Sequence, residues 1–331
     1  MIITKGDKMS GMISADCGVD DVIEELSFEA VSDAVVRIVT AAETTIPDDA
    51  VRALSSALEN ETNEAAKAQL SAILKNIGIA SSLKVPVCQD TGIFIFWVEI
   101  GRSLTLGFDL EGAIRDGCAR ATKSVPLRPN VVDPLTRRNS GNNLGDGLPD
   151  INYEFVPGNS LKIVFAPKGA GSENMSALRM FMPTEIPEIV RFVAETVLRA
   201  GGKPCPPLVL GIGIGGSFDK SARLAKKALT EPLRTRDELD PFEKEILDAV
   251  NSLGIGCMGL GGNTTALSVR VRKASCHTAS LPVAVNIQCW ADRHAAAVYN
   301  GDDGKDRSGL NVCGKDSGRA GGKDTEKGKE A

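Results

Sequence analysis

The chain has 331 residues, of which 42% are hydrophobic and 24% are charged, and its formal net charge is −5. This composition predicts a globular chain with one large core or two ordinary ones, and it excludes a fibrous or wholly disordered protein. An acidic balance with no run of Lys and Arg argues against nucleic acid as a partner. No apolar run reaches the roughly 18 residues of a membrane span. Because residues 1–20 also lack a secretory leader pattern, we expect a cytoplasmic protein.

The first eighty residues predict a helical region. Apolar residues recur at helical spacing from Asp21 to about Thr40. A second helix is predicted to open at Pro47, and a third to run from about Asn63 until Gly78 stops it. The polar residues of this region show no chemical clustering, so we expect it to serve as scaffold.

The rest of the chain predicts a mixture of strands and helices. Residues 93–100 and 104–109 are expected to form a hairpin, and residues 125–150, rich in Pro, Gly and Asn, a long polar loop. Further strands are predicted over residues 161–165, 208–214, 266–271 and 281–287, and further helices over 110–122, 184–199 and 240–253. The expected class is therefore α/β, with a helical N-terminal region followed by a mixed α/β part. Residues 301–331, almost without apolar side chains, predict a disordered tail.

Three loops beside predicted strands each present a cysteine among polar groups. Cys88 lies in VPVCQDTG before the run at 93–100, Cys205 in PCPP before 208–214, and Cys289 in QCWADRH after 281–287. The eight cysteines are too sparse for a disulfide framework and form no C-x-x-C pair. They are either inert core residues or ligands that converge on a soft metal or an iron–sulfur cluster.

Two glycine-rich stretches and a few arginines allow anion binding. KGAGSEN at 168–174 can cradle an anion with its backbone N–H groups. GIGIGGS at 211–217 lacks the dinucleotide spacing, so its glycines are expected to let a strand and a helix approach closely, and a nucleotide- or phosphate-binding enzyme stays a remote alternative. Arg128, Arg137 and Arg138 are either anion ligands or solvated surface residues.

Taken in order, four motifs resemble the α subunit of the two-subunit iron–sulfur hydro-lyases, the class I fumarate hydratase and L-tartrate dehydratase family. The motifs are CQDTG at 88–92, KGAGSEN at 168–174, CPP at 205–207, and HTAS at 277–280 through CWADR at 289–293. The resemblance places a catalytic domain at residues 21–300, between a flexible segment 1–20 and the tail 301–331. It departs at Ala170, where glycine is common, and in the tail.

The resemblance implies a [4Fe–4S] cluster held by Cys88, Cys205 and Cys289. Three thiolates leave one iron without a protein ligand, and such an iron is a Lewis acid for the hydroxyl and a carboxylate of a 2-hydroxy acid. The remaining cysteines that lack such a setting are expected to be structural or incidental, namely Cys118, Cys257, Cys276 and Cys313.

The resemblance also implies roles for five further residues. Gln89 and Asp90 would contact the substrate, with Asp90 giving or accepting a proton. Arg128 would pair with a substrate carboxylate, because a guanidinium fork suits that group. The Gly169 backbone would bind the substrate, and His277 would reach a carboxylate or the hydroxyl. The implied reaction is hydration of fumarate to L-malate, with dehydration of L-tartrate as the alternative.

A partner chain is implied as well. The family's complete enzymes contain a β region that supplies basic residues and a proton-transfer Thr, which this chain lacks as far as its sequence shows. We therefore expect a separate β subunit, a dicarboxylate substrate, and an α2β2 heterotetramer or an α homodimer. A non-catalytic subunit or assembly partner is the other class left open.

Overall fold

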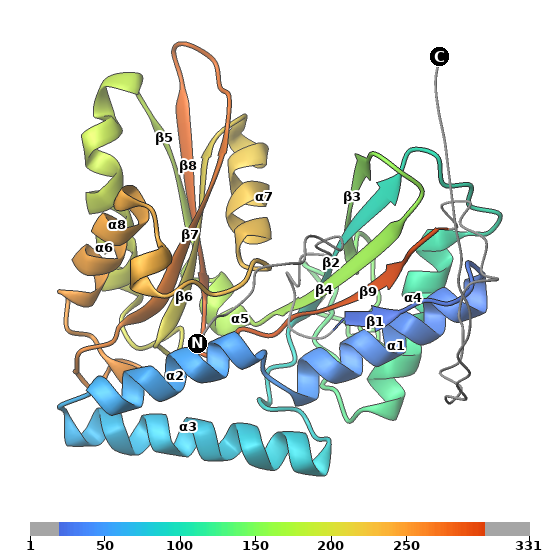
Figure 1. Cartoon of the computed structure of the whole chain (residues 1–331), viewed down its shortest axis with the longest axis horizontal. Helices are drawn as coiled ribbons and strands as arrows, with labels where there is room; N and C mark the ends of the chain where they lie inside the picture. The colour runs from blue at the N-terminus through green and yellow to red at the C-terminus, as the bar shows by residue number, and fades with distance from the viewer. Residues whose placement is uncertain (1–19, 302–331) are drawn as a thin grey trace, which may run out of the picture. The chain divides into compact units, whose positions relative to one another are not determined.

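The computed structural model describes residues 20–301, which form two β-sheets with flanking helices (Figure 1). The predicted α/β class with a helical N-terminal region is confirmed. Predictions made for residues 1–19 and 302–331, including the one for Cys313, lie outside the described residues. In the part of the chain that the structure describes, no helix is both long and apolar enough to cross a membrane.

The N-terminal region contains strand β1 (Asp20–Val22) and helices α1 (Phe28–Thr44), α2 (Asp48–Asn60) and α3 (Glu64–Leu83). Two expected boundaries are wrong. The first helix begins at Phe28, because residues 20–22 pair in parallel with β9 (Ala295–Tyr299), a partner that local spacing cannot reveal. Helix α3 continues through Gly78, where an added Cβ would meet no neighbouring atom. The helix ends instead at its C-cap, Lys84, which has a left-handed backbone conformation.

The first sheet has the strand order β1-β9-β4-β2-β3, and α1 and α4 (Leu110–Ser124) cover one of its faces. Strand β2 (Ile93–Gly101) pairs antiparallel with β4 (Leu161–Lys168) and parallel with β3 (Asp150–Val156). The core of this sheet includes Val35, Phe94, Phe96, Ile114 and Phe165.

The predicted hairpin of residues 93–100 and 104–109 is wrong. Residues 104–109 form no strand, because their alternating apolar side chains, Leu104, Leu106 and Phe108, pack against the core of the first sheet from outside the ladder. Asp109 instead caps α4 by accepting from the N–H of Gly112. The true neighbour is β3, in which apolar and polar residues alternate as expected for a strand. The local signal was therefore present, and the prediction overlooked it directly after the polar loop at 125–150.

The second sheet has the order β5-β8-β6-β7, formed by β5 (Ala177–Phe181), β6 (Leu208–Gly215), β7 (Ala266–Ala274) and β8 (Leu281–Gln288). Helices α6 (Ile189–Ala200) and α8 (Pro241–Asn251) pack on one face, and the core there includes residues of both helices and of the sheet. The helix predicted at 240–253 is present as α8 and begins with a capping box formed by Asp240 and Glu243. The helix predicted from Thr184 starts as the 3-10 turn Pro183–Glu188, with Pro187 inside it.

Helix α7 (Phe218–Ala228) packs directly on β6, and two glycines make this possible. A Cβ added at Gly211 would lie 2.0 Å from the carbonyl oxygen of Ala225, and one at Gly213 would lie 2.0 Å from that of Ser221. The prediction that these glycines serve close strand–helix approach is confirmed, because the helix occupies the space where a side chain would stand.

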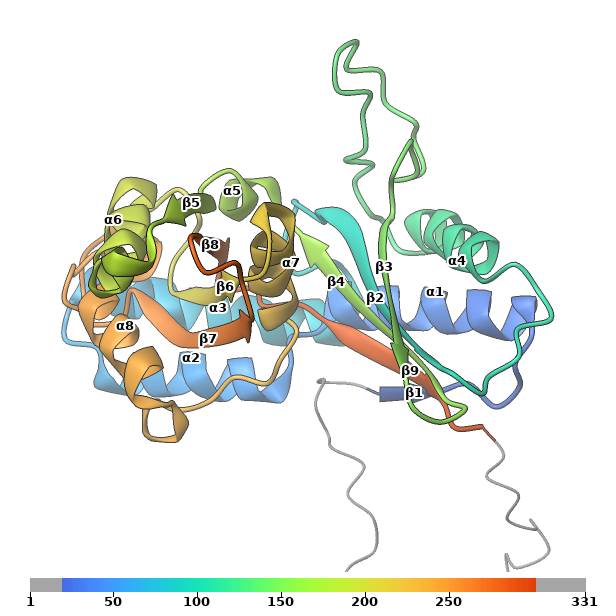
Figure 2. The same ribbon diagram turned by 90° about the horizontal axis from the view of Figure 1, so that it is seen from above.

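A third apolar cluster joins α2 and α3 to the loops that carry the predicted ligands; it includes Cys88, Cys289 and Trp290. The predicted polar loop at 125–150 is present between α4 and β3 and projects from the sheet (Figure 2). Three short helical segments complete the chain: α5 (Ala170–Glu173), the 3-10 turn Arg236–Glu238 and the 3-10 turn Cys257–Gly259.

Candidate functional site

Sheet topology brings Cys205 and Cys289 to the same end of the two central strands of the second sheet. Strands β6 and β8 run antiparallel with Val209 opposite Gln288, so the start of β6 and the end of β8 coincide. Cys205 lies just before β6 and Cys289 directly after β8, and the N–H of Trp290 donates to the carbonyl oxygen of Cys205 at 3.2 Å. The expectation that these cysteines lie in strand-end loops is confirmed.

The third cysteine, Cys88, lies within electrostatic reach of the other two. Burial raises the pKa of the Cys205 thiol, and the nearby Cys88 and Asp90 raise it further. Burial also raises the pKa of Cys289; Arg293 opposes this increase, and Cys88 adds to it. Cys88 is thus near each of the other two thiols, and the hydrogen bond between Trp290 and Cys205 joins the loops that carry those two.

Asp90 lies beside these thiols with its carboxylate held at both oxygens. The N–H of Gly92 donates to Oδ1 at 3.0 Å, and the N–H of Ala170 donates to Oδ2 at 2.8 Å. A Cβ added at Gly169 would lie 3.0 Å from Oδ2 of Asp90. Only glycine therefore lets these two segments of the chain approach this closely without displacement. The structure therefore brings together Asp90 and Gly169, as the resemblance implied.

Lys168 connects the two sheets directly behind Gly169, a role that the sequence did not reveal. Its Nζ donates to the Ser172 hydroxyl at 2.7 Å and to the carbonyl oxygen of Ile287, on β8, at 2.8 Å. Burial lowers the pKa of Lys168 to about 8, against the opposing effect of Glu173. A lysine buried to this degree needs such partners, because an unpaired buried ammonium is costly.

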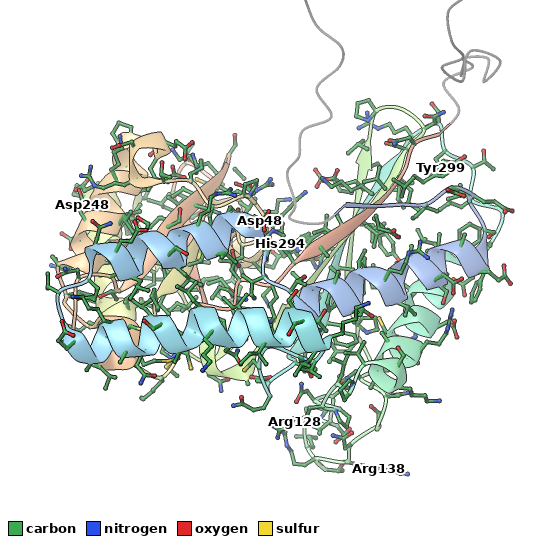
Figure 3. The ribbon with its side chains drawn as sticks, turned by 60° about the horizontal axis from the view of Figure 1, so that its bottom comes forward. Asp48, Arg128, Arg138, Asp248, His294 and Tyr299 are labelled. Carbon is green, nitrogen blue, oxygen red and sulfur yellow. The ribbon has the colours of Figure 1, made fainter. Side chains whose placement is uncertain are left out.

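Arg128 lies at the base of the polar loop and close to the Asp90 segment. Its carbonyl oxygen accepts from the Thr91 hydroxyl at 3.1 Å and from the Asn143 side-chain amide at 3.2 Å, while its side chain is exposed. Figure 3 shows Arg128 and Arg138 on the same projecting loop. Backbone contacts thus hold Arg128 beside the segment that carries Asp90, and the side chains of Arg128 and Gln89 are both exposed.

His277 is not brought to the other predicted site residues within one chain. It lies in the exposed loop that precedes β8, whereas Cys289 directly follows that strand. Eight residues of extended chain separate the two ends of β8 by roughly 25 Å. The Nδ1 of His277 accepts from the N–H of Ala279 at 3.1 Å, which accounts for its local conformation.

The other cysteines of residues 20–301 lie in different settings. Cys118 and Cys257 are fully buried, and burial raises the pKa of both thiols, to about 11 for Cys257. Cys276 is exposed beside His277, at the far end of β8 from Cys289. Cys257 does lie near a held carboxylate, Glu61, which raises its pKa further, but this thiol is fully buried and belongs to a 3-10 turn, not to a strand-end loop.

A separate cavity of about 370 Å³ lies between α7, β8 and β2. It is lined by Trp97, Glu173, Lys226 and Asn286 among others, and it includes none of the predicted site residues. We place the site at the strand-end loops because the thiols, the held carboxylate and the exposed guanidinium are there.

The donor set at these loops consists of thiols, which suit iron–sulfur clusters as well as single soft metal ions. Among residues 20–301, no three His, Cys, Asp or Glu side chains are placed to hold one metal ion. A four-iron cluster has a different requirement, because its thiolate ligands bind different irons and stand farther apart than the ligands of one ion. Burial raises the pKa of the Cys289 thiol on balance, and the nearby Arg293 and Lys168 oppose this increase.

The matches to known proteins define the class first. Residues 32–298 match the family described as fumarate hydratase (Fumerase), and the chain therefore belongs to this family. Its reaction class is that of a hydro-lyase.

The similar proteins then indicate which subunit of this family the chain resembles. A Methanocaldococcus jannaschii protein named "Putative L(+)-tartrate dehydratase subunit alpha" is 50% identical over 273 residues, covering 80% of this chain and 96% of the relative. The L(+)-tartrate dehydratase subunit alpha of Escherichia coli O157:H7 is 32% identical over 264 residues, covering 78% of this chain and 87% of the relative. That of Escherichia coli K12 is 31% identical over the same length. The resemblance to the α subunit of this family is confirmed.

Proposed function

We propose that the chain is the α subunit of a hydro-lyase that reversibly hydrates fumarate to L-malate with a [4Fe–4S] cluster held by Cys88, Cys205 and Cys289. The observation that carries this proposal is that hydrogen bonds join the three strand-end loops that carry these thiols, from Trp290 to Cys205 and from Arg293 to the Asp90 carbonyl oxygen, while both carboxylate oxygens of Asp90 are held. When bound, the cluster supplies a Lewis-acidic iron, which a hydroxyl leaving group needs.

The protein groups would divide the remaining work of hydration. Asp90 is fixed by Gly92 and Ala170, so its carboxylate is oriented before the substrate arrives and can accept or return a proton at the carbon next to the hydroxyl. Arg128 offers a fork for one substrate carboxylate. The Gly169 backbone lies close enough to Asp90 to border the same substrate, and Gln89 is exposed beside it.

L-Tartrate is a second candidate substrate, and the printed names of the relatives support it. Fumarate, malate and tartrate are all four-carbon dicarboxylates, and both reactions move water across the same pair of carbon atoms. Arg128, Asp90 and Gly169 have no feature that separates the two. The family name supports fumarate, and we keep it as the first candidate.

A β subunit would complete the site, and the electrostatics of the described residues support this part of the proposal. The substrate is a dianion, and the neighbouring Asp90 is acidic. Lys168 and Arg293 already have buried partners, so the exposed cations that we identify in these loops among residues 20–301 are Arg128 and Lys203. Because an incompletely compensated dianion is costly to bind, a partner chain with basic residues is required.

His277 keeps its proposed role only in an assembly. Since it lies roughly 25 Å along β8 from Cys289, another copy of the chain would have to bring it to the substrate. An α homodimer or an α2β2 heterotetramer would allow this. The nucleotide-binding alternative gains no support, because α7 occupies the space over Gly211 and Gly213.

The test is anaerobic reconstitution of the chain with iron and sulfide, followed by assays of fumarate hydration and L-tartrate dehydration with and without the candidate β chain. We expect fumarate turnover that needs the β chain. Turnover of tartrate but not fumarate would reverse the choice of substrate, and full turnover by the α chain alone would contradict the two-subunit proposal. Absence of both activities in the combined chains would refute the hydro-lyase proposal.

A further inference from the structure

We propose that the buried ion pair of Glu43 and Arg293 is a positioning device for the loop that carries Cys88 and Asp90. This inference rests on the proposed function, because it concerns the residues that would bind the cluster and transfer the proton. Neither Glu43 nor Arg293 is among the predicted site residues, and neither would touch the substrate.

The side-chain contact is direct. The Nη1 of Arg293 donates to Oε2 of Glu43 at 2.6 Å, and its Nη2 donates to the carbonyl oxygen of Asp90 at 2.9 Å. Arg293 is 3% exposed and Glu43 is 0% exposed, so neither contact competes with solvent. One guanidinium fork thus joins the last turn of α1 to the peptide of the proposed proton-transfer residue.

A second contact from Glu43 reaches the other end of the same loop. The N–H of Val87 donates to the carbonyl oxygen of Glu43 at 2.9 Å, and the carbonyl oxygen of Val87 accepts from the side chain of Asn76 at 2.8 Å. Glu43 therefore holds Val87 through its backbone and Asp90 through Arg293. Cys88 lies between these two attachment points, so both of its flanks are fixed from behind.

The cost of this arrangement favours positioning over simple stabilisation. Burying two charges costs several kcal/mol per ion, and well-packed apolar residues often serve stability as well or better. Burial raises the pKa of Glu43 to about 7, against the opposing effect of Arg293. A pair held at this cost, with its spare donor aimed at the backbone of Asp90, is best explained by the geometry that it imposes on the loop.

The test uses two conservative variants in the full chain. Arg293→Lys keeps the charge, but an ammonium lacks the fork that spans Glu43 and the Asp90 carbonyl. Glu43→Gln keeps an acceptor oxygen but removes the charge that orients the guanidinium. The matched control is Arg270→Lys, which alters the other buried ion pair of this region, Arg270 with Asp292 at 3.3 Å, without a contact to Asp90.

The first measurement is amide hydrogen exchange, which needs neither cluster nor turnover. The N–H groups of Gly92 and Ala170 donate to the Asp90 carboxylate, so their protection reports its position. We expect both Glu43→Gln and Arg293→Lys to speed exchange at these amides by about 10-fold. Arg270→Lys is expected to leave exchange at these two amides unchanged. The variants are compared at an equal loss of melting temperature, so that a general loss of stability does not account for the difference. Unchanged exchange at both amides in both variants, or equal acceleration in Arg270→Lys, would overturn the proposal.

The second measurement is steady-state kinetics of the reconstituted enzyme with its β chain. We expect Glu43→Gln and Arg293→Lys to lower kcat by about 10- to 100-fold, the scale of a small misplacement of a reacting group. The KM is expected to change by less than about 3-fold, and the iron content to stay at the wild-type level. A wild-type kcat in both variants would contradict the proposal. If the wild-type enzyme shows no hydro-lyase activity, the proposed function fails, while the exchange measurement still decides whether the pair positions the loop.

Discussion

Two carboxylates in this chain are held in the same way, yet only one is suited to chemistry. Asp90 accepts from the N–H groups of Gly92 and Ala170, which are far apart in sequence. Glu61 likewise accepts from the N–H of Thr62 at 2.8 Å and from that of the distant Asn263 at 2.9 Å. Each carboxylate therefore joins two separate segments of the chain.

The difference between them lies in their surroundings. Glu61 is 3% exposed, and a Cβ added at Gly262 would lie 2.6 Å from its Oε2, so the turn is closed over it. Asp90 is only partly buried and stands beside the partly exposed Cys88 and the exposed Cys205. Glu61 also has a thiol nearby, Cys257, but that thiol is fully buried. Access to the carboxylate and to its neighbouring thiols therefore distinguishes the candidate site, whereas backbone donation by itself does not.

The largest difference between the two carboxylates is expected when the charge of Asp90 is removed. Asp90→Asn keeps the volume of the side chain but removes the group that accepts the proton, so we expect kcat to fall by at least about 100-fold with the iron content unchanged. The matched variant Glu61→Gln is expected to leave kcat unchanged. Steady-state assays of both variants with the β chain check this, and wild-type turnover by Asp90→Asn would remove the role given to it.

A smaller effect is expected at Arg128, which belongs to the Asp90 region. Arg128→Lys retains the charge but loses the bidentate fork, and we expect KM for the dicarboxylate to rise by about 10-fold. The backbone contacts of Arg128 with Thr91 and Asn143 do not involve its side chain, so the fold should be unaffected. Arg138→Lys, on the same loop, is the control; an equal rise in KM there would argue against a specific contact.

Removing the charge of the buried Glu61 is expected to affect stability and not turnover. Glu61→Gln places an amide N–H₂ against backbone donors, and we expect a loss of about 1–3 kcal/mol in the free energy of unfolding, the cost of an unsatisfied buried group. Thermal or denaturant unfolding of the full chain measures it. A stability equal to that of the wild type would mean that the N–H groups around Glu61 contribute nothing.

The pH dependence of that loss gives the finest distinction. Although burial of Glu61 opposes its ionisation, the N–H groups of Asn63 and its neighbours hold its pKa below the ordinary value of 4.5. The folded pKa is thus lower than the unfolded one, so this carboxylate contributes its full stability above pH 4.5 and loses it as the pH falls through the folded value. The stability difference between wild type and Glu61→Gln should therefore shrink in acid, and a difference that grows would contradict this sign.

The sequence predicted the local parts of the site and missed what long-range contacts supply. Cys88, Cys205 and Cys289 stood out because each lies beside an apolar run that became β2, β6 or β8. Glu43 and Arg293 were not recognisable as a pair, because 250 residues separate them and each looks ordinary in its own segment.

The same limit applies to the fold. Helices with caps, such as α8 with its capping box, were predicted because the signal is local. The pairing of β1 with β9 and of β2 with β3 depends on residues far away in the chain, and no local pattern encodes it. The separation of His277 and Cys289, by contrast, could have been predicted, because the expected strand at 281–287 already lies between them.

The measurement that tests the central claim most directly is cluster assembly on single cysteine variants. After anaerobic reconstitution of the full chain, we expect Cys88→Ala, Cys205→Ala and Cys289→Ala each to lose the brown chromophore and its bound iron and sulfide, because three thiolates are needed to hold the cluster. Cys118→Ala, which alters a fully buried thiol in the core of the first sheet, is expected to keep both. Equal iron content and equal spectra in all four variants would contradict the three-thiol site.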